Sequence, residues 1–126
     1  MSEDRKSTIP PASERRSHDR FPVAWSVGCG TDDTFLYASI TNISAMGIFI
    51  QTREPKALGT EMVLSFSPPG HEPFKLRGTV AWINPYRENG DNPNPGMGVR
   101  FVDLTTEERE RIVEVIHTIA YVRDPE

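Results

Sequence analysis

The feature that most constrains the fold is a series of short segments between residues 21 and 102 in which apolar and polar residues alternate. A period of two is typical of β-strands that bury only one face. Turn-forming residues such as Pro68-Pro69-Gly70 separate the segments. In the longest segment the alternation places Leu76, Val80 and Trp82 on the same side. We predict strands over residues 21–28, 35–43, 48–50, 62–66, 74–83 and 97–102.

The last part of the chain has a different period. Thr105 followed three residues later by Glu108 is a capping-box pattern, which marks the start of a helix. Apolar residues then recur at the spacing of the buried face of an amphipathic helix, at Ile112, Val115, Ile116 and Ile119. We therefore predict a helix from about residue 106 to about residue 120.

Six short antiparallel strands followed by one helix predict an all-β-dominated fold. The strands form a six-stranded antiparallel β-barrel, and the C-terminal helix packs on it or beside it. Closing the sheet into a barrel removes the open edges that so short a chain could not cover. We assign residues 14–122 to this single domain and residues 1–13 to a flexible N-terminal tail. The first 17 residues have almost no apolar side chains whose burial could offset the entropy lost on ordering.

Composition limits the classes of function. The net charge is −4, so a general affinity for nucleic acid, which requires a basic surface, is not expected. The single cysteine, Cys29, excludes an internal disulfide framework and is typical of a reducing compartment. No apolar run has the length of a membrane span, and the N-terminus is polar, unlike a signal peptide. We expect a cytoplasmic protein without membrane insertion.

Catalytic patterns are weak. The three histidines, His18, His71 and His117, have no metal-ligand spacing among them. Cys29 has no histidine near it in sequence and is interpreted as a small strand residue. No glycine-rich, phosphate-binding loop leads into a helix. We therefore expect no enzymatic activity, no metal and no cofactor.

Two short motifs remain. The first is the basic run that ends at the first strand, with Arg15, Arg16 and Arg20. A solvated charged segment is one interpretation. The other is a ligand grip, because the guanidinium fork donates two parallel hydrogen bonds to anionic groups and its flat face stacks on rings.

The second motif is Asn42-x-Ser44-x-x-Gly47, between the second and third strands. Its local interpretation is a turn or bulge, in which Asn42 and Ser44 bond nearby backbone and Gly47 adopts a conformation that other residues resist. The alternative is a ligand pocket. An Asn amide and a Ser hydroxyl can bond the edge of a base, and a glycine allows a flat ligand close to the backbone.

Taken together, Arg16-x-x-x-Arg20 and Asn42-x-Ser44-x-x-Gly47 resemble the two-part signature of the PilZ domain, a family of bacterial receptors for cyclic di-GMP. The order and spacing agree, and the resemblance covers about residues 14–120. It implies a six-stranded β-barrel with a C-terminal helix, which is the fold derived above from the alternation.

The resemblance also implies roles for individual residues. Arg16 and Arg20 are expected to bind the phosphates and guanine edges of cyclic di-GMP and to stack on its bases. The guanine pocket on the barrel surface is expected to contain Asn42, Ser44 and Gly47. Arg15, outside the minimal signature, is expected to assist with a phosphate or a second ligand molecule.

The main hypothesis is therefore a cyclic di-GMP receptor that changes its surface on binding and so regulates a protein effector. A nucleotide-independent interaction module with the same fold is the alternative. A barrel that binds single-stranded nucleic acid is disfavoured by the acidic balance. Both a monomer and a homodimer are compatible with the sequence.

Overall fold

The computed structural model describes residues 20–88, 92 and 94–123. The expected flexible arm, apart from Arg20, lies outside these residues. The described residues form six strands and one helix: β1 (Phe21–Gly30), β2 (Phe35–Ile43), β3 (Gly47–Gln51), β4 (Glu61–Phe66), β5 (Phe74–Asn84), β6 (Gly96–Val102) and α3 (Thr106–Arg123).

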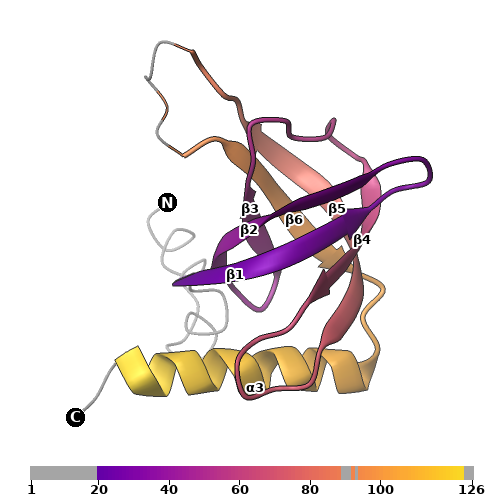
Figure 1. Ribbon diagram of the computed structural model, residues 1–126. Helices are drawn as coiled ribbons and strands as arrows, with labels where there is room; N and C mark the ends of the chain where they lie inside the picture. Colours follow the sequence, from indigo (N-terminus) through magenta and orange to yellow (C-terminus); the bar gives the residue numbers. More distant parts are fainter. Residues whose placement is uncertain (1–19, 89–91, 93, 124–126) are drawn as a thin grey trace, which may run out of the picture.

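The strands close into a barrel in the order β1-β2-β3-β6-β5-β4, with every neighbouring pair antiparallel (Figure 1). The helix α3 lies across one end of the barrel, beneath β1 in the view of Figure 1. The predicted six-stranded antiparallel barrel with a C-terminal helix is thus confirmed. Several strands extend one or two residues beyond the predicted limits.

Alternation along the strands produces the core. In β4 the side chains of Met62, Leu64 and Phe66 point inward and are at most 4% exposed, whereas the residues between them are exposed. Burying each large apolar side chain contributes about 1.5–3 kcal/mol to folding. From the helix, Ile112, Val115 and Ile116 join the same core, as their spacing predicted.

One side chain lies opposite to its predicted position. In β5, Val80 pairs with Val99 and Trp82 pairs with Gly98, so that Ala81 is an additional residue in the strand. This β-bulge reverses the alternation. Trp82 is consequently 46% exposed on the outer surface. The prediction that Trp82 shares the inner face with Leu76 and Val80 is therefore wrong.

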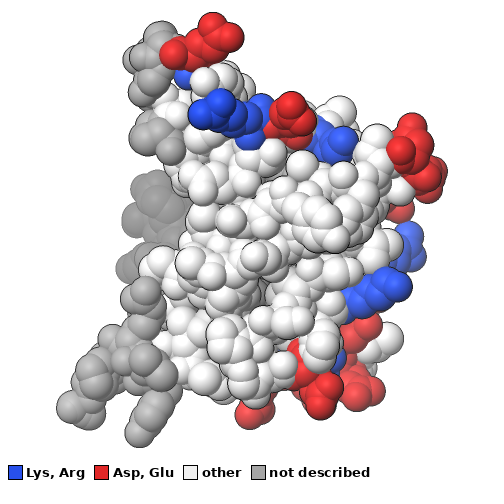
Figure 2. Space-filling model, viewed as in Figure 1, with Lys and Arg blue, Asp and Glu red and all other residues white. Residues whose placement is uncertain are grey.

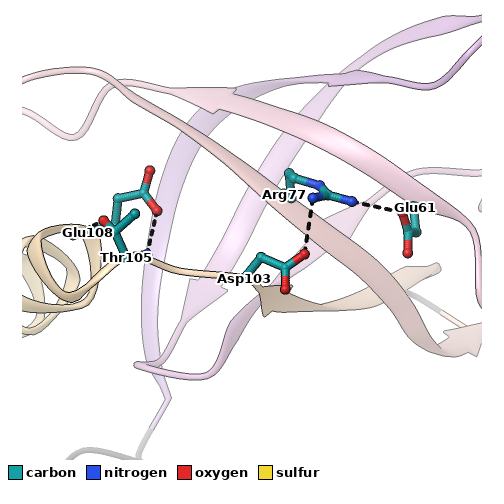
Figure 3. A network of polar contacts seen from close by, with 5 residues as sticks. All are labelled: Glu61, Arg77, Asp103, Thr105 and Glu108. Atoms are coloured by element: carbon teal, nitrogen blue, oxygen red, sulfur yellow. Dashed lines mark hydrogen bonds and ion pairs between the residues drawn. The ribbon is translucent and has the colours of Figure 1, made fainter.

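The predicted capping box begins the helix (Figure 3). The N–H of Glu108 donates to Thr105 Oγ1, and the N–H of Thr105 donates to Glu108 Oε1, both at 3.0 Å. These two bonds satisfy backbone donors that have no partner within a helix. The helix continues to Arg123, three residues beyond its predicted end.

A single arginine attaches the helix to the β4–β5 connection. Arg111 Nη2 donates to the carbonyl oxygens of Glu72 (2.7 Å) and Pro73 (3.2 Å). The guanidinium also lies 4.0 Å from the centre of the Phe74 ring, in a cation–π contact. Helix and barrel are therefore joined by polar contacts as well as by the core.

A second polar group lies on the outside of the barrel (Figure 3). Arg77 forms ion pairs with Glu61 (3.2 Å) and with Asp103 (3.0 Å), which has a φ of 57° in the connection to the helix. All three side chains are more than half exposed, so each pair contributes at most about 1 kcal/mol.

Three asparagines hold the base of the long β5–β6 loop. The amides of Asn84 and Asn92 bond each other reciprocally, at 3.1 and 2.8 Å, and Asn84 Nδ2 also donates to the carbonyl of Asn94 at 2.7 Å. These bonds connect the two ends of the loop. Of the helices in the described part of the chain, none is long and apolar enough to span a membrane.

Candidate functional site

The structure brings the described parts of the two motifs together. Arg20 immediately precedes β1, Asn42 is the penultimate residue of β2, Ser44 lies in the β2–β3 turn, and Gly47 begins β3. Arg15 and Arg16 lie outside the described residues. Although 24 residues separate them, Arg20 Nη1 donates to Ser44 Oγ at 3.4 Å. This is a long hydrogen bond, and therefore a weak one.

The Ser44 hydroxyl organises the turn. Its oxygen accepts the N–H of Met46 at 3.1 Å, and its proton is directed at the carbonyl of Gly47 at 3.5 Å. The backbone closes the same turn, with the N–H of Ser44 on the Gly47 carbonyl at 2.9 Å. With Arg20 as second donor, the hydroxyl's one donor and two acceptor positions are all occupied. A ligand that bonds Ser44 must therefore displace one of these partners; Arg20 contributes a side chain, whereas the other two partners are backbone groups of the turn itself.

The Arg20 side chain is exposed overall, but its charged group is partly desolvated against the barrel. This burial lowers the pKa of Arg20 from its ordinary value. The guanidinium stays protonated, because arginine titrates far above neutral pH. A cation held in a partly dry position interacts more strongly with an anion than one in free solution does.

Gly47 is required for a reason that the sequence did not indicate. The left-handed glycines in the described chain are Gly59 and Gly70, so Gly47 does not supply an unusual φ. Instead, a Cβ at position 47 would overlap the carbonyl oxygen of Val99 on β6. The glycine lets β3 and β6 approach closely, which brings the turn over the barrel wall. The expectation of a special backbone conformation at Gly47 is corrected accordingly.

Asn42 has an unsatisfied acceptor. Its Oδ1 is buried and has no hydrogen-bond partner among the described residues. One neighbour in register is Pro22, which has no N–H to donate, and the other is Phe49. A buried acceptor without a partner costs about 1–3 kcal/mol. An N–H donor would be favourable at this oxygen, but a ligand can reach it only if the Asn42 side chain turns outward.

A hollow of about 160 Å³ lies next to the turn, with a tryptophan on one side. Because Gly98 has no side chain, the Trp82 indole lies over it and stacks on Phe49, with ring centres 5.2 Å apart. Arg20 and Arg100 also border the hollow. The remaining lining residues are Met46, Gly47, Ala81, Gly98 and Val99.

The hollow therefore combines a flat aromatic surface, glycine backbone and two guanidiniums. These groups suit a planar, anionic ligand. Its volume is below the 300–1,000 Å³ of typical small-molecule pockets. The described residues would thus contact one side of such a ligand only.

Sequence reasoning missed Trp82 and Arg100 as members of the site. For Arg100, a signal was present: since Met97 and Val99 alternate inward along β6, Gly98 and Arg100 must face outward. For Trp82, the signal was Gly98, which pairs with it on the neighbouring strand β6. A glycine in a strand often has an aromatic ring from the next strand over it, but the bulge that allows this leaves no clear mark in the sequence.

The Cys29 thiol does not border this hollow. Cys29 is 1% exposed in the core, and burial raises the pKa of its thiol to about 11, despite the opposing effect of Lys56. Such a thiol is a poor nucleophile. In the described part of the chain, no three His, Cys, Asp or Glu side chains lie close enough to hold a metal ion.

The fold is thus a small closed barrel with a surface hollow at the start of β3. A family model described as the PilZ domain matches residues 14–117. The chain belongs to the PilZ domain family, whose members include receptors for cyclic di-GMP. A search of proteins with curated functions found no match.

Solved structures share the fold at low sequence identity. The inhibitor of motility MotI/DgrA of Bacillus subtilis matches with a TM-score of 0.71 and 14% identity, over 93% of this chain and 59% of its own. The PilZ domain of YcgR from Escherichia coli, solved with c-di-GMP, matches with a TM-score of 0.67 and 14% identity, over 86% of this chain and 94% of that domain.

A third structure, PlzA of Borreliella burgdorferi in complex with c-di-GMP, matches with a TM-score of 0.57 and 9% identity. The match covers 91% of this chain and 44% of PlzA. This chain thus spans less than two thirds of the length of MotI/DgrA and of PlzA.

Proposed function

We propose that this protein binds cyclic di-GMP at the hollow between the β2–β3 turn and Trp82, and that binding changes the surface it offers to a protein effector. The observation that carries the proposal is the contact between Arg20 and Ser44, which joins the two motifs at 3.4 Å. Membership of the PilZ family, and the presence of c-di-GMP in the YcgR and PlzA structures, support the choice of ligand.

Each described residue has a role that follows from its chemistry. Arg20 donates to a phosphate or to the O6 and N7 of guanine, leaving Ser44 free to bond the ligand in its place. The Asn42 side chain turns outward on binding, and its unsatisfied Oδ1 then accepts from guanine N1–H and N2–H₂. Gly47 keeps the turn close to the wall, and the exposed Trp82 indole stacks on a base.

Arg15 and Arg16 complete the site in this proposal. Because the hollow is small, the described wall contacts one face of the nucleotide, and the arm that carries these two arginines covers the other. Ordering the arm on binding costs conformational entropy, so the affinity is moderate and sensitive to salt. The covered nucleotide and the ordered arm form the new surface that the effector recognises. The protein acts in this way without catalysis, in the cytoplasm.

Isothermal titration calorimetry with cyclic di-GMP tests the proposal. The intact protein should release heat at micromolar ligand, and Arg20→Ala should weaken binding roughly 10- to 150-fold, since a hydrogen bond to a charged group contributes about 1.5–3 kcal/mol. Arg109→Ala, which removes the same charge from the exposed side of α3, is the matched control and should bind normally. Absence of heat with the intact protein, or equal losses in both variants, would contradict the proposal.

A further inference from the structure

A second hollowed surface lies on the outside of β1 and β2, away from Arg20. We call it the β1–β2 face and define it by Ala24, Ser26, Gly28, Phe35 and Tyr37. Neither strand contains an Asp, Glu, Lys, Arg or His residue. In Figure 2 the front of the molecule, over these strands, is correspondingly free of charged atoms, and charges of both signs lie around its border.

Two aromatic side chains project from this face. Phe35 is 58% exposed and Tyr37 is 80% exposed. Their rings meet edge to face, with centres 4.8 Å apart. Phe35 lies over Gly28, since a Cβ at that glycine would stand 2.8 Å from the tip of the ring. The neighbouring glycine and the second ring thus hold Phe35, and most of Tyr37 is left in contact with water.

A trough of about 490 Å³ runs between β1 and the end of β4 with the β4–β5 connection, and Tyr37 borders it. From β1 it is lined by the small outward residues Ala24, Ser26 and Gly28 and also by Trp25 and Val27, with Phe66 and Phe74 from β4 and β5. Pro73 and Ser65 contribute to the opposite side. The surface therefore contains a projecting aromatic pair and a hollow that adjoins one of its rings, Tyr37.

We propose that the β1–β2 face binds a second copy of this chain, with Tyr37 of each copy in the trough of the other. A two-fold dimer places one patch against itself, which requires a surface that has both the projection and the hollow. β1 pairs with β4 only over Gly28–Gly30, and the trough lies beside this opening between the two strands.

Charge favours this occupant over others. Each copy has a net charge of −4, and an uncharged face lets two copies meet without bringing like charges together. An anionic membrane or a nucleic acid would need basic residues on the face, which β1 and β2 do not have. The four exposed rings of two copies supply roughly 500 Å² of apolar surface, nearly half of the about 1,200 Å² at which stable interfaces begin.

The proposed dimer is independent of nucleotide. Tyr37 precedes Asn42 by five residues on β2, a separation of roughly 17 Å along an extended strand. The two surfaces can therefore be tested separately. A failure of cyclic di-GMP to bind would leave the oligomeric state of the protein unaffected. Equally, a protein that stays monomeric could still bind cyclic di-GMP.

Sedimentation equilibrium measures association directly, up to about 100 µM protein, where a micromolar dimer is fully detectable. The intact protein should have twice the monomer mass. Tyr37→Glu and Ser26→Arg should each raise the dissociation constant at least about 100-fold, because each buries an unpaired charge in the interface. Tyr86→Glu makes the same substitution at a tyrosine of the β5–β6 loop and should leave the dimer intact.

Mixing the two variants tests the arrangement itself. If Tyr37 of one copy meets the trough of the other, a Tyr37→Glu copy and a Ser26→Arg copy should associate as a heterodimer through the new charge pair. An intact protein that is monomeric at all concentrations would overturn the proposal. So would a dimer that tolerates both substitutions, or mixed variants that remain monomeric while their melting curves match that of the intact protein.

Discussion

Two aromatic rings of this barrel lie over glycines of a neighbouring strand, and their surroundings differ. Trp82 of β5 lies over Gly98 of β6, and Phe35 of β2 lies over Gly28 of β1. Around Trp82 there are two guanidiniums, and one of them, that of Arg20, also donates to the Ser44 hydroxyl of the β2–β3 turn. Around Phe35 there is a second ring, and the two strands beneath carry no charge.

The difference shows that the aromatic–glycine pair does not by itself select a ligand. In both places the glycine makes room and the ring supplies a flat apolar surface. The polar groups nearby decide what that surface can bind, because they are either matched by a ligand or left without partners on burial. Next to Trp82 they suit an anionic nucleotide, and next to Phe35 their absence suits an uncharged surface.

The largest effect is expected at a third glycine, where the neighbour is backbone and not a ring. Gly47→Ala should lower the free energy of unfolding by about 3 kcal/mol or more, because its Cβ would overlap the Val99 carbonyl and separate β3 from β6. Unfolding in guanidinium chloride measures the loss. Gly98→Ala is the control, since the exposed Trp82 ring can move aside. An equal loss of stability in Gly98→Ala would contradict the distinction between a glycine that faces backbone and one that faces a side chain.

Next in size is the effect of removing the indole at the candidate nucleotide site. Trp82→Ala should weaken cyclic di-GMP binding roughly 5- to 150-fold, given that stacking on an aromatic side chain contributes about 1–3 kcal/mol per base. Calorimetry gives the affinity. Tyr86→Ala removes an aromatic side chain of similar exposure that does not border the hollow, and it should bind like the intact protein. Unchanged affinity in Trp82→Ala would place the nucleotide elsewhere.

Two smaller effects, one on nucleotide binding and one on self-association, would separate the two surfaces. Gly98→Ala tilts Trp82 and should weaken nucleotide binding a few-fold, with self-association unchanged. Gly28→Ala displaces Phe35 and should weaken self-association a few-fold, with nucleotide affinity unchanged. Calorimetry and sedimentation on both variants test this. If either substitution altered both properties equally, the two faces would be coupled and the comparison would fail.

The last effect is confined to alkaline pH and concerns Cys29, which follows Gly28 on β1 and points into the core. Burial raises the pKa of its thiol from about 9.0 to about 11, so the unfolded chain loses this proton first as the pH rises. Stability is therefore fully retained below pH 9 and falls between pH 9 and 11, by about 1 kcal/mol at pH 10. Denaturant unfolding of the intact protein and of Cys29→Ala should diverge in this window, and parallel curves would exclude the effect.

Most of the fold could be predicted from the sequence because the signals are local. Alternation defined the strands, and Thr105 with Glu108 defined the start of the helix. The inner face of β4 could be predicted as well, since no irregularity interrupts its pairing. Where a bulge interrupts β5, the same rule placed Trp82 on the wrong face.

The candidate site was predictable only in part. The motifs identified Arg20, Ser44 and Gly47 as neighbours before their geometry was known, but the reason for the glycine lies on β6, about fifty residues away in sequence. The clash at position 47 is decided by the register of β3 with β6, and register cannot be deduced from one strand at a time.

The asparagine bonds at the base of the β5–β6 loop have a consequence for engineering the protein. Because Asn84, Asn92 and Asn94 fasten the two ends of the loop by their own hydrogen bonds, the pairing of β5 with β6 does not rely on a specific tight turn at the tip. Extending such a loop adds only a slowly growing closure entropy, about 0.6 kcal/mol for each doubling of its length. A peptide tag or reporter inserted between Glu88 and Asn92 should therefore leave the barrel folded.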